Sequence, residues 1–314
     1  MATTRQSIVR GPGTVTFNSV KLFDADGITA EVESSTQEIP SSIAGNIDTI
    51  KTDQIGKVTL TPVGEISSAL LELLYPYQTP NPGASIMGST DKSLVISSRA
   101  GTKVTFLNAA LSKIPDLILS PVKTAFGSAE FTALLANGKL PTDENSFFKV
   151  ETAAYSDGEP GRTGLSGCHY VGTWGSGQGA LTIPDTQDGW TVSFELQLDP
   201  VTTDSQGTID YTFGGLTVRA SCTPLGLTEA QIMAALPILS GRGASTATTK
   251  NLVIAAANPG LTVTLNNAAL VTGPLAWGST TLRAGQIGFV AHRAISNGTL
   301  GALYSVAQTS ESDE

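Results

Sequence analysis

The chain has 314 residues, of which 40% are apolar and only 14% are charged, and its formal net charge is −9. This length is long for one ordinary domain and can hold two buried cores. The charged fraction lies well below the roughly 25% of an average soluble protein, so much of the surface is expected to be small and polar. The acidic balance argues against a broad basic patch that grips DNA, and no run of about 20 apolar residues predicts a membrane span.

The opening segment, MATTRQSIVRGPG, lacks the apolar core of a secretory signal. The two cysteines, Cys168 and Cys222, form neither a disulfide framework nor a metal-ligand pattern in the sequence. We therefore expect the chain to be made in the cytoplasm.

The sequence contains an internal repeat at an offset of 162 residues. At this register Asp26–Thr29 aligns with Asp188–Thr191, and Thr61–Gly64 aligns with Thr223–Gly226. Ten positions are identical, and four of them are Gly or Pro, the residues that fix turns. They are Asp26, Gly27, Thr29, Glu33, Gly45, Ile47, Asp48, Thr61, Pro62 and Gly64. Composition alone would rarely produce this match.

The match continues downstream with small insertions, where Val104–Leu111 aligns with Val263–Leu270 and Asn137-Gly138 aligns with Asn297-Gly298. The repeat divides the chain into segments. We expect an N-terminal arm at 1–12, a first copy at 13–140, a linker rich in Pro, Gly, Ser and acids at 141–166, a second copy at 167–303, and an acidic disordered tail at 304–314.

Each copy is predicted to be rich in β-strands and to hold one short helix. Strands are expected at Thr14–Phe17, Gly27–Glu33 and Gly189–Leu198, and the last of these alternates apolar and polar residues. Apolar residues at helical spacing predict a helix over Ile66–Leu74, and Thr228 with Gln231 forms a capping box for its counterpart. The predicted fold is mainly β: two tandem copies of a β-sandwich or barrel-like domain.

The order of these elements resembles a known family. The resemblance is carried by the strand, Thr-Pro-x-Gly turn and helix of each copy, by the polar loop after the helix, and by the late Val-Thr-Phe/Leu segments (Gly56–Tyr75, Leu216–Leu236, Val104–Leu111 and Val263–Leu270). It covers most of both copies. The chain is similar to the major tail tube proteins of long-tailed (siphovirus-type) bacteriophages, in the form with two tube domains per chain.

The resemblance implies a structural protein of the virion. Three chains would form a pseudo-hexameric ring, and rings would stack into a hollow tube through which the genome passes. The implied partners are further copies of the chain and the tape-measure, tail-tip and terminator proteins, while double-stranded DNA would pass without specific binding. The resemblance also implies that arms and long loops contact the next ring, and we expect these contacts at Met1–Pro12, Gln78–Thr90 and the linker.

The charge fits such a channel, because a basic wall would hold DNA by counterion release whereas an acidic or neutral wall would let it slide. The carboxylate pairs Asp24/Asp26 and Glu31/Glu33 each share one face of a strand and are interpreted as a solvated or lumen-facing acidic row. The alternative reading is that the net charge of −9 only maintains solubility.

No constellation in the sequence predicts an enzyme, a cofactor site or a metal site. Cys168 and His169 are adjacent and His292 lies far away, which is a poor set of ligands. The glycine-rich run Gly175–Gly179 lacks the Lys-Ser/Thr of a phosphate-binding loop and is interpreted as a turn. Asp48 and Asp210 recur in both copies and are expected to bond the local backbone.

Two other functions remain open. A single-ring tail component, such as a terminator or a distal adaptor, would form rings without polymerising. A two-domain module that binds carbohydrate or another surface would need a cluster of exposed aromatic residues, for which Trp174, Trp190 and Trp277 are available.

Overall fold

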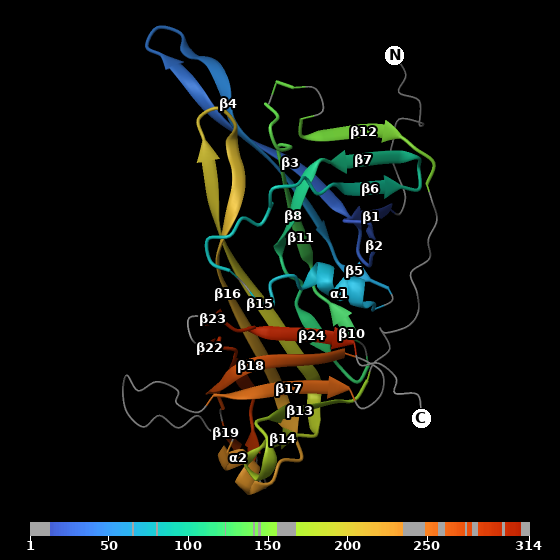
Figure 1. The fold of residues 1–314 in the computed structure, drawn as a ribbon, viewed down its shortest axis with the longest axis vertical. Coiled ribbons are helices and arrows are strands. Elements are labelled where there is room, and N and C mark those ends of the chain that lie inside the picture. The colour runs from blue at the N-terminus through green and yellow to red at the C-terminus, as the bar shows by residue number, and fades with distance from the viewer. Residues whose placement is uncertain are drawn as a thin grey trace.

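The computed structural model describes residues 13–64, 66–79, 81–122, 124–140, 142–143, 146–155, 168–234, 249–256, 261–273, 275–277, 282–296 and 299–308. The fold is mainly β, as predicted, with antiparallel sheets and, among these residues, two short α-helices (Figure 1). In the described ranges, no helix is long and apolar enough to cross a membrane.

The elements of the first half of the chain come in the following order. They are β1 (Gly13–Phe17), β2 (Val20–Asp24), β3 (Thr29–Ser41), β4 (Gly45–Leu60), β5 (Pro62–Val63), α1 (Ser68–Leu74), β6 (Leu94–Ser98), β7 (Thr102–Phe106), β8 (Asn108–Lys113), β9 (Leu117–Leu119), β10 (Thr124–Phe126), β11 (Ala129–Leu134) and β12 (Phe148–Thr152).

The second half repeats this order. Its elements are β13 (Tyr170–Trp174), the 3-10 turn η2 (Gly177–Gly179), β14 (Leu181–Ile183), β15 (Asp185–Thr203), β16 (Gly207–Leu225), α2 (Glu229–Ala234), β17 (Lys250–Ala256), β18 (Leu261–Thr272), β19 (Leu275–Trp277), β20 (Leu282–Ala284), β21 (Ile287–Val290), β22 (Ile295–Ser296), β23 (Thr299–Leu300) and β24 (Tyr304–Gln308).

Two long hairpins dominate the fold, β3–β4 in the first half and β15–β16 in the second (Figure 1). Their pairing registers agree at the offset of the repeat, since Thr29 faces Thr59 and Thr191 faces Ser221. Both turns end at a glycine, Gly45 or Gly207, with a φ of 72°. This is the left-handed region that glycine enters without steric cost.

The remaining strands also pair alike in the two halves. In the first half β6 lies between β1 and β7, and β11 lies between β4 and β8. In the second half β17 lies between β13 and β18, and β21 lies between β16 and the C-terminal part of β18. Strands β12 and β24 close the set by pairing with β7 and β18. The two halves thus share strand order and register.

The structure changes two of the expected boundaries. Strand β12 lies inside the segment 141–166 that was expected to be a linker, and it pairs with β7, so the first half extends to Thr152. Its side chains are mostly exposed, which is why no buried alternation marks it in the sequence. Strand β24 lies inside the segment 304–314 that was expected to be disordered; Tyr304 and Val306 are buried there. Residues 1–12, 156–167 and 309–314 lie outside the described residues.

Both predicted helices are present, and α1 begins two residues later than expected. Helix α1 begins after Ser67, whose side chain accepts a hydrogen bond from the Leu70 N–H at 3.2 Å. The capping box of α2 is confirmed, because Gln231 Oε1 accepts from the Thr228 N–H at 2.9 Å and Thr228 Oγ1 accepts from the Gln231 N–H at 3.4 Å.

One apolar core runs through both halves of the chain. The repeat aligns Val104 with Val263 and predicts that an aspartate at either position does equal harm. The structure separates the two positions, because Val263 is fully buried between Ile254 and Val306, whereas Val104 is only partly buried and pairs with the exposed Val150.

We therefore expect unequal losses from the two substitutions. Val263→Asp buries an unpaired carboxylate and should cost more than about 4 kcal/mol of unfolding free energy, whereas Val104→Asp should cost about 1–2 kcal/mol. Chemical denaturation of both variants measures the difference. Equal losses would mean that the greater exposure of Val104 does not reduce the cost of placing an aspartate there.

Candidate assembly surfaces

The distal parts of the two long hairpins extend away from the core and lie side by side (Figure 1). In β3 and in the first half of β4 nearly every side chain is exposed, on both faces of the ribbon. A two-stranded ribbon with two wet faces is only marginally stable alone. The chain builds a surface here that is suited to contact with further copies of similar hairpins.

The turn of the second hairpin is anchored to the first one. Asp53 of β4 accepts hydrogen bonds from the Thr208 N–H at 3.0 Å and from Thr208 Oγ1 at 2.6 Å. Thr208 is buried at this contact. The turn at Gly207 therefore lies beside the middle of β4, set back from the turn at Gly45, so the two hairpins are staggered.

Replacing Asp53 by alanine should weaken this contact. Two charge-assisted hydrogen bonds to a buried threonine are lost, and we expect the unfolding free energy to fall by about 2 kcal/mol. Asp48→Ala is the matched control, because exposed Asp48 bonds only the N–H of the next residue and should change stability by less than about 0.5 kcal/mol. Urea denaturation of both variants checks this, and equal losses would show that the contact contributes nothing.

A second junction joins the halves through strand addition. Strand β9 of the first half pairs with the outer edge of β15 in the second, with Leu119 opposite Trp190 and Leu117 opposite Val192. The backbones come so close that a Cβ atom at Gly189 would lie 2.7 Å from Ser120 Cα. The first half thus extends the sheet of the second half and covers its edge.

The polar loop after α1 also joins the halves. Within the predicted contact segment Gln78–Thr90, the Gly83 N–H donates to Phe213 O at 2.8 Å, and the Ile86 N–H donates to Tyr211 O at 2.9 Å. Ile86 and Met87 are buried against β16. This part of the loop, which was expected to contact a neighbouring ring, is therefore engaged within the chain.

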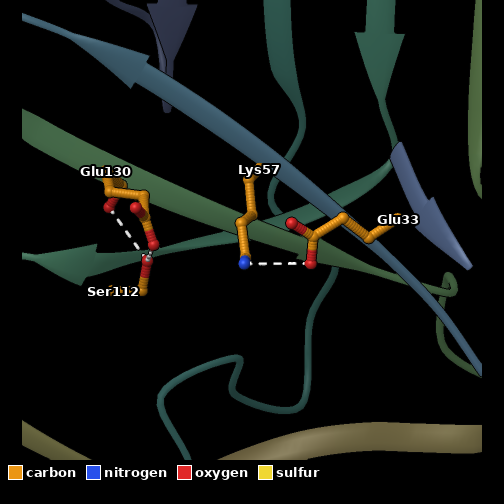
Figure 2. A network of polar contacts seen from close by, with 4 residues as sticks. All are labelled: Glu33, Lys57, Ser112 and Glu130. Carbon is orange, nitrogen blue, oxygen red and sulfur yellow. Dashed lines mark hydrogen bonds and ion pairs between the residues drawn. The ribbon is translucent and has the colours of Figure 1, made fainter. Parts of the chain in front are cut away.

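One face of the sheet formed by β3, β4, β11 and β8 carries a polar network (Figure 2). Lys57 Nζ lies 3.0 Å from Glu33 Oε2, and Ser112 Oγ donates to the backbone oxygen of Glu130 at 3.1 Å. The hydrogen bond to Glu33 raises the pKa of Lys57, and both groups are substantially exposed. The predicted acidic row of Glu31 and Glu33 is thus partly neutralised by Lys57.

The four strands of the long hairpins are acidic overall, with ten carboxylates and three basic side chains. The carboxylates are Glu31, Glu33, Glu38, Asp48, Asp53, Asp185, Asp188, Glu195, Asp199 and Asp210, and the basic residues are Lys51, Lys57 and Arg219. The long hairpins therefore form a surface that repels polyanions on average.

The structure gives several of the singled-out carboxylates a role in local structure. Asp48 and Asp210 each accept a hydrogen bond from the N–H of the following residue at 2.7 Å, so the expected bond to the local backbone is confirmed in both copies. Asp24 accepts from the Gly27 N–H and, at 2.7 Å, from the Thr61 N–H. Asp24 thereby fixes two turns and does not belong to an exposed row.

The residues considered for metal or phosphate chemistry lie apart. His169 Nε2 is 3.1 Å from Asp185 Oδ1 on the surface. Cys222 is buried, which raises the pKa of its thiol, and it is not bonded to Cys168. Gly177–Gly179 forms a 3-10 turn whose Gly179 carbonyl accepts from Lys250 Nζ at 2.8 Å. No group of three potential metal ligands occurs within the part of the chain that the structure describes.

The tryptophans considered for a binding module are used in the core. Trp190 is fully buried against Phe289, and Trp174 is buried with its Nε1 donating to Ala268 O at 2.8 Å. Neither ring is available to stack on a sugar. The side chain of Trp277 lies outside the described residues.

No protein-family model matches the sequence, and a search of curated proteins finds no significant relative.

Proposed function

We infer that the chain is a structural protein that polymerises as stacked rings, three chains to a pseudo-hexameric ring, into the hollow tail tube of a bacteriophage virion. The observation that carries this proposal is the matched register of the two long hairpins and their staggered, side-by-side placement. Similar units that meet through unlike surfaces form a ring when the rotation between neighbours closes on itself.

The stagger between the hairpins supports a closed barrel of strands. Strands can close into a barrel only when they are tilted and when neighbouring strands are shifted in register. The contact of Asp53 with Thr208 produces a shift of this kind between the two hairpins of one chain. Six hairpins with this shift would form a continuous wall around a channel.

The charge of the long hairpins supports passage of DNA through that channel. Carboxylates outnumber basic side chains on these strands. One of the basic side chains, Lys57, already forms an ion pair with Glu33 of the neighbouring strand (Figure 2). A wall with more carboxylates than basic side chains neutralises few phosphates, so DNA releases few counterions on contact with it and is held weakly. Tape-measure, tail-tip and terminator proteins would be the partners at the ends of the tube.

Negative-stain electron microscopy with parallel measurement of solution mass tests the proposal. Stacked rings or hollow tubes, with three chains per ring, are the expected result. Single rings that do not stack at any concentration would instead indicate a terminator or an adaptor. A persistent monomer at high concentration would overturn the proposal of self-assembly and favour a two-domain binding module.

A further inference from the structure

Strand β9 of the first half pairs with β15 of the second, and the counterparts of these two strands, β19 and β3, do not pair with each other in the described part of the chain. Hairpin β9–β10 connects β8 to β11, and hairpin β19–β20 connects β18 to β21. The two hairpins have equal length and register, since Leu117 faces Phe126 in the first and Leu275 faces Ala284 in the second. Strand β10 lies beside β5, and β20 lies beside β16, the strand that contains the counterparts of β5.

The hairpins differ in what they pair with. Strand β9 adds to the edge of β15, whereas β19 pairs only with β20 within the described part of the chain. On the other side, β15 has its edge covered, and its counterpart β3 is the outermost strand of its sheet in the described residues. One strand without an edge partner and one uncovered edge therefore remain, in the positions that match an existing junction.

We propose that hairpin β19–β20 of one chain adds to the edge of β3 in a second copy of this chain, so that Leu275, Ala276 and Trp277 pair with Ala30, Thr29 and Ile28. The register follows from Leu117, Ile118 and Leu119, which pair with Val192, Thr191 and Trp190 inside the chain. This pairing rests on the proposed ring and specifies the contact that closes it.

The apolar stripe on β3 supports the position of this contact. Trp190 and Val192 are fully buried in β15, and Phe194 is 6% exposed. At the matching positions, Ile28 is partly buried against the core, Ala30 is exposed and Val32 is 42% exposed, although Val58 beside Ala30 is fully buried. The side chains Ala30 and Val32 of β3 are therefore uncovered at the place where the first half itself covers the second. A second copy would cover them.

Two glycines show the same difference in backbone contact. A Cβ at Gly189 would collide with the backbone of Ser120, but a Cβ at Gly27 would meet no atom within 4 Å. Both glycines have positive φ values, 90° and 108°. Gly189 is needed for the close approach of β9, and the open space at Gly27 is the matching seat for an approaching β19 backbone.

Cysteine cross-linking tests the register of the pairing. In a Cys168→Ser background, Thr29→Cys and Ala276→Cys would face each other across the junction, at the distance of directly opposed strand residues that a disulfide can span. Oxidation of the assembled protein should give linked dimers and trimers on a non-reducing gel. The pair Glu31→Cys with Ala276→Cys, displaced by two residues, should link far less.

The matching pair inside the chain provides the positive control. Ile118→Cys and Thr191→Cys occupy the existing junction and should form a disulfide without any gain in mass. Rings that contain no linked chains, while this control pair oxidises, would overturn the pairing and leave the ring itself standing. A protein that stays monomeric at all concentrations would overturn both.

Gly27→Ala gives an independent test without cysteines. The added methyl group has room in the single chain but would collide with the β19 backbone of the neighbour. We expect ring assembly to weaken at least about tenfold in apparent affinity, measured by analytical ultracentrifugation. Gly138→Ala is the control, because Gly138 also has a positive φ and open space. Equal assembly of the two variants at equal thermal stability would contradict the proposed pairing.

Discussion

Replacing Gly172 by valine is expected to lower the unfolding free energy by about 3 kcal/mol, and replacing Trp190 by isoleucine in the same chain is expected to restore most of it. The reason is a close contact between the two residues. A Cβ at Gly172 would lie 2.7 Å from Trp190 Cη2, so any side chain there collides with the buried indole.

The first half solves the same packing problem with a different pair of residues. Val15 pairs with Leu22 and Ile96 as Gly172 pairs with Ile183 and Ile254, and the repeat aligns Ile28 with Trp190. The pair Gly172 and Trp190 in the second half, one small and one large residue, thus stands where the first half has the two branched residues Val15 and Ile28. Exchanging both residues together should transfer the packing of the first half into the second.

A double-mutant cycle with urea denaturation measures this compensation. Trp190→Ile alone should cost about 2 kcal/mol because it leaves a cavity, and the double variant should lose no more than about 1 kcal/mol, well below the sum of the single losses. Losing the N–H group of the indole adds no hydrogen-bond penalty, because Trp190 Nε1 has no hydrogen-bond partner among the described residues. Additive losses would contradict the equivalence of the two positions.

Features that depend on local pattern could be predicted from the sequence. The alternation in Gly189–Leu198 predicts β15, and the recurring Gly45 and Gly207 mark the turns of both long hairpins. The capping box at Thr228 correctly predicts where α2 begins. These signals arise within a few residues of the structure that they specify, so one copy of the sequence is enough to detect them.

The junction between the halves could not be predicted in this way. Strand β9 is three residues long and pairs with residues more than 70 positions later, and no periodicity encodes such a partner. Asp53 has Gly215 as its counterpart in the repeat, so the comparison of copies does not single it out. Strand β12 is hidden because its side chains are exposed on both faces, which removes the alternation that marks a half-buried strand.

The repeat carries information that neither copy holds alone. It identifies positions that occupy the same place in the two halves but are differently covered, such as Val192 and Ala30. In a closed ring every copy has the same neighbours, so a difference in burial between equivalent positions measures what a single chain lacks. By this criterion the edge of β3 is incomplete, and the turn of the first long hairpin is the next most conspicuous surface.

Ile43→Asp is expected to abolish the stacking of rings and to leave the rings themselves intact. Ile43 lies at the turn of hairpin β3–β4 and is 95% exposed, and Ile47 and Ile50 near the start of β4 are 59% and 49% exposed. Several exposed isoleucines at the tip of a protruding hairpin indicate a protein contact. The tip lies far from the junction of β9 with β15, so in a tube it would face the neighbouring ring.

The size of the effect follows from the number of tips at each boundary between rings. Burying one isoleucine side chain contributes roughly 2 kcal/mol, and three chains would place three tips at each boundary. A charged residue in each tip should therefore raise the concentration needed for tube growth by at least about a hundredfold. Electron microscopy and sedimentation measure tube length and ring mass. Ile43→Leu keeps the apolar contact and should form tubes; tubes of normal length from Ile43→Asp would exclude the hairpin tip from the contact between rings.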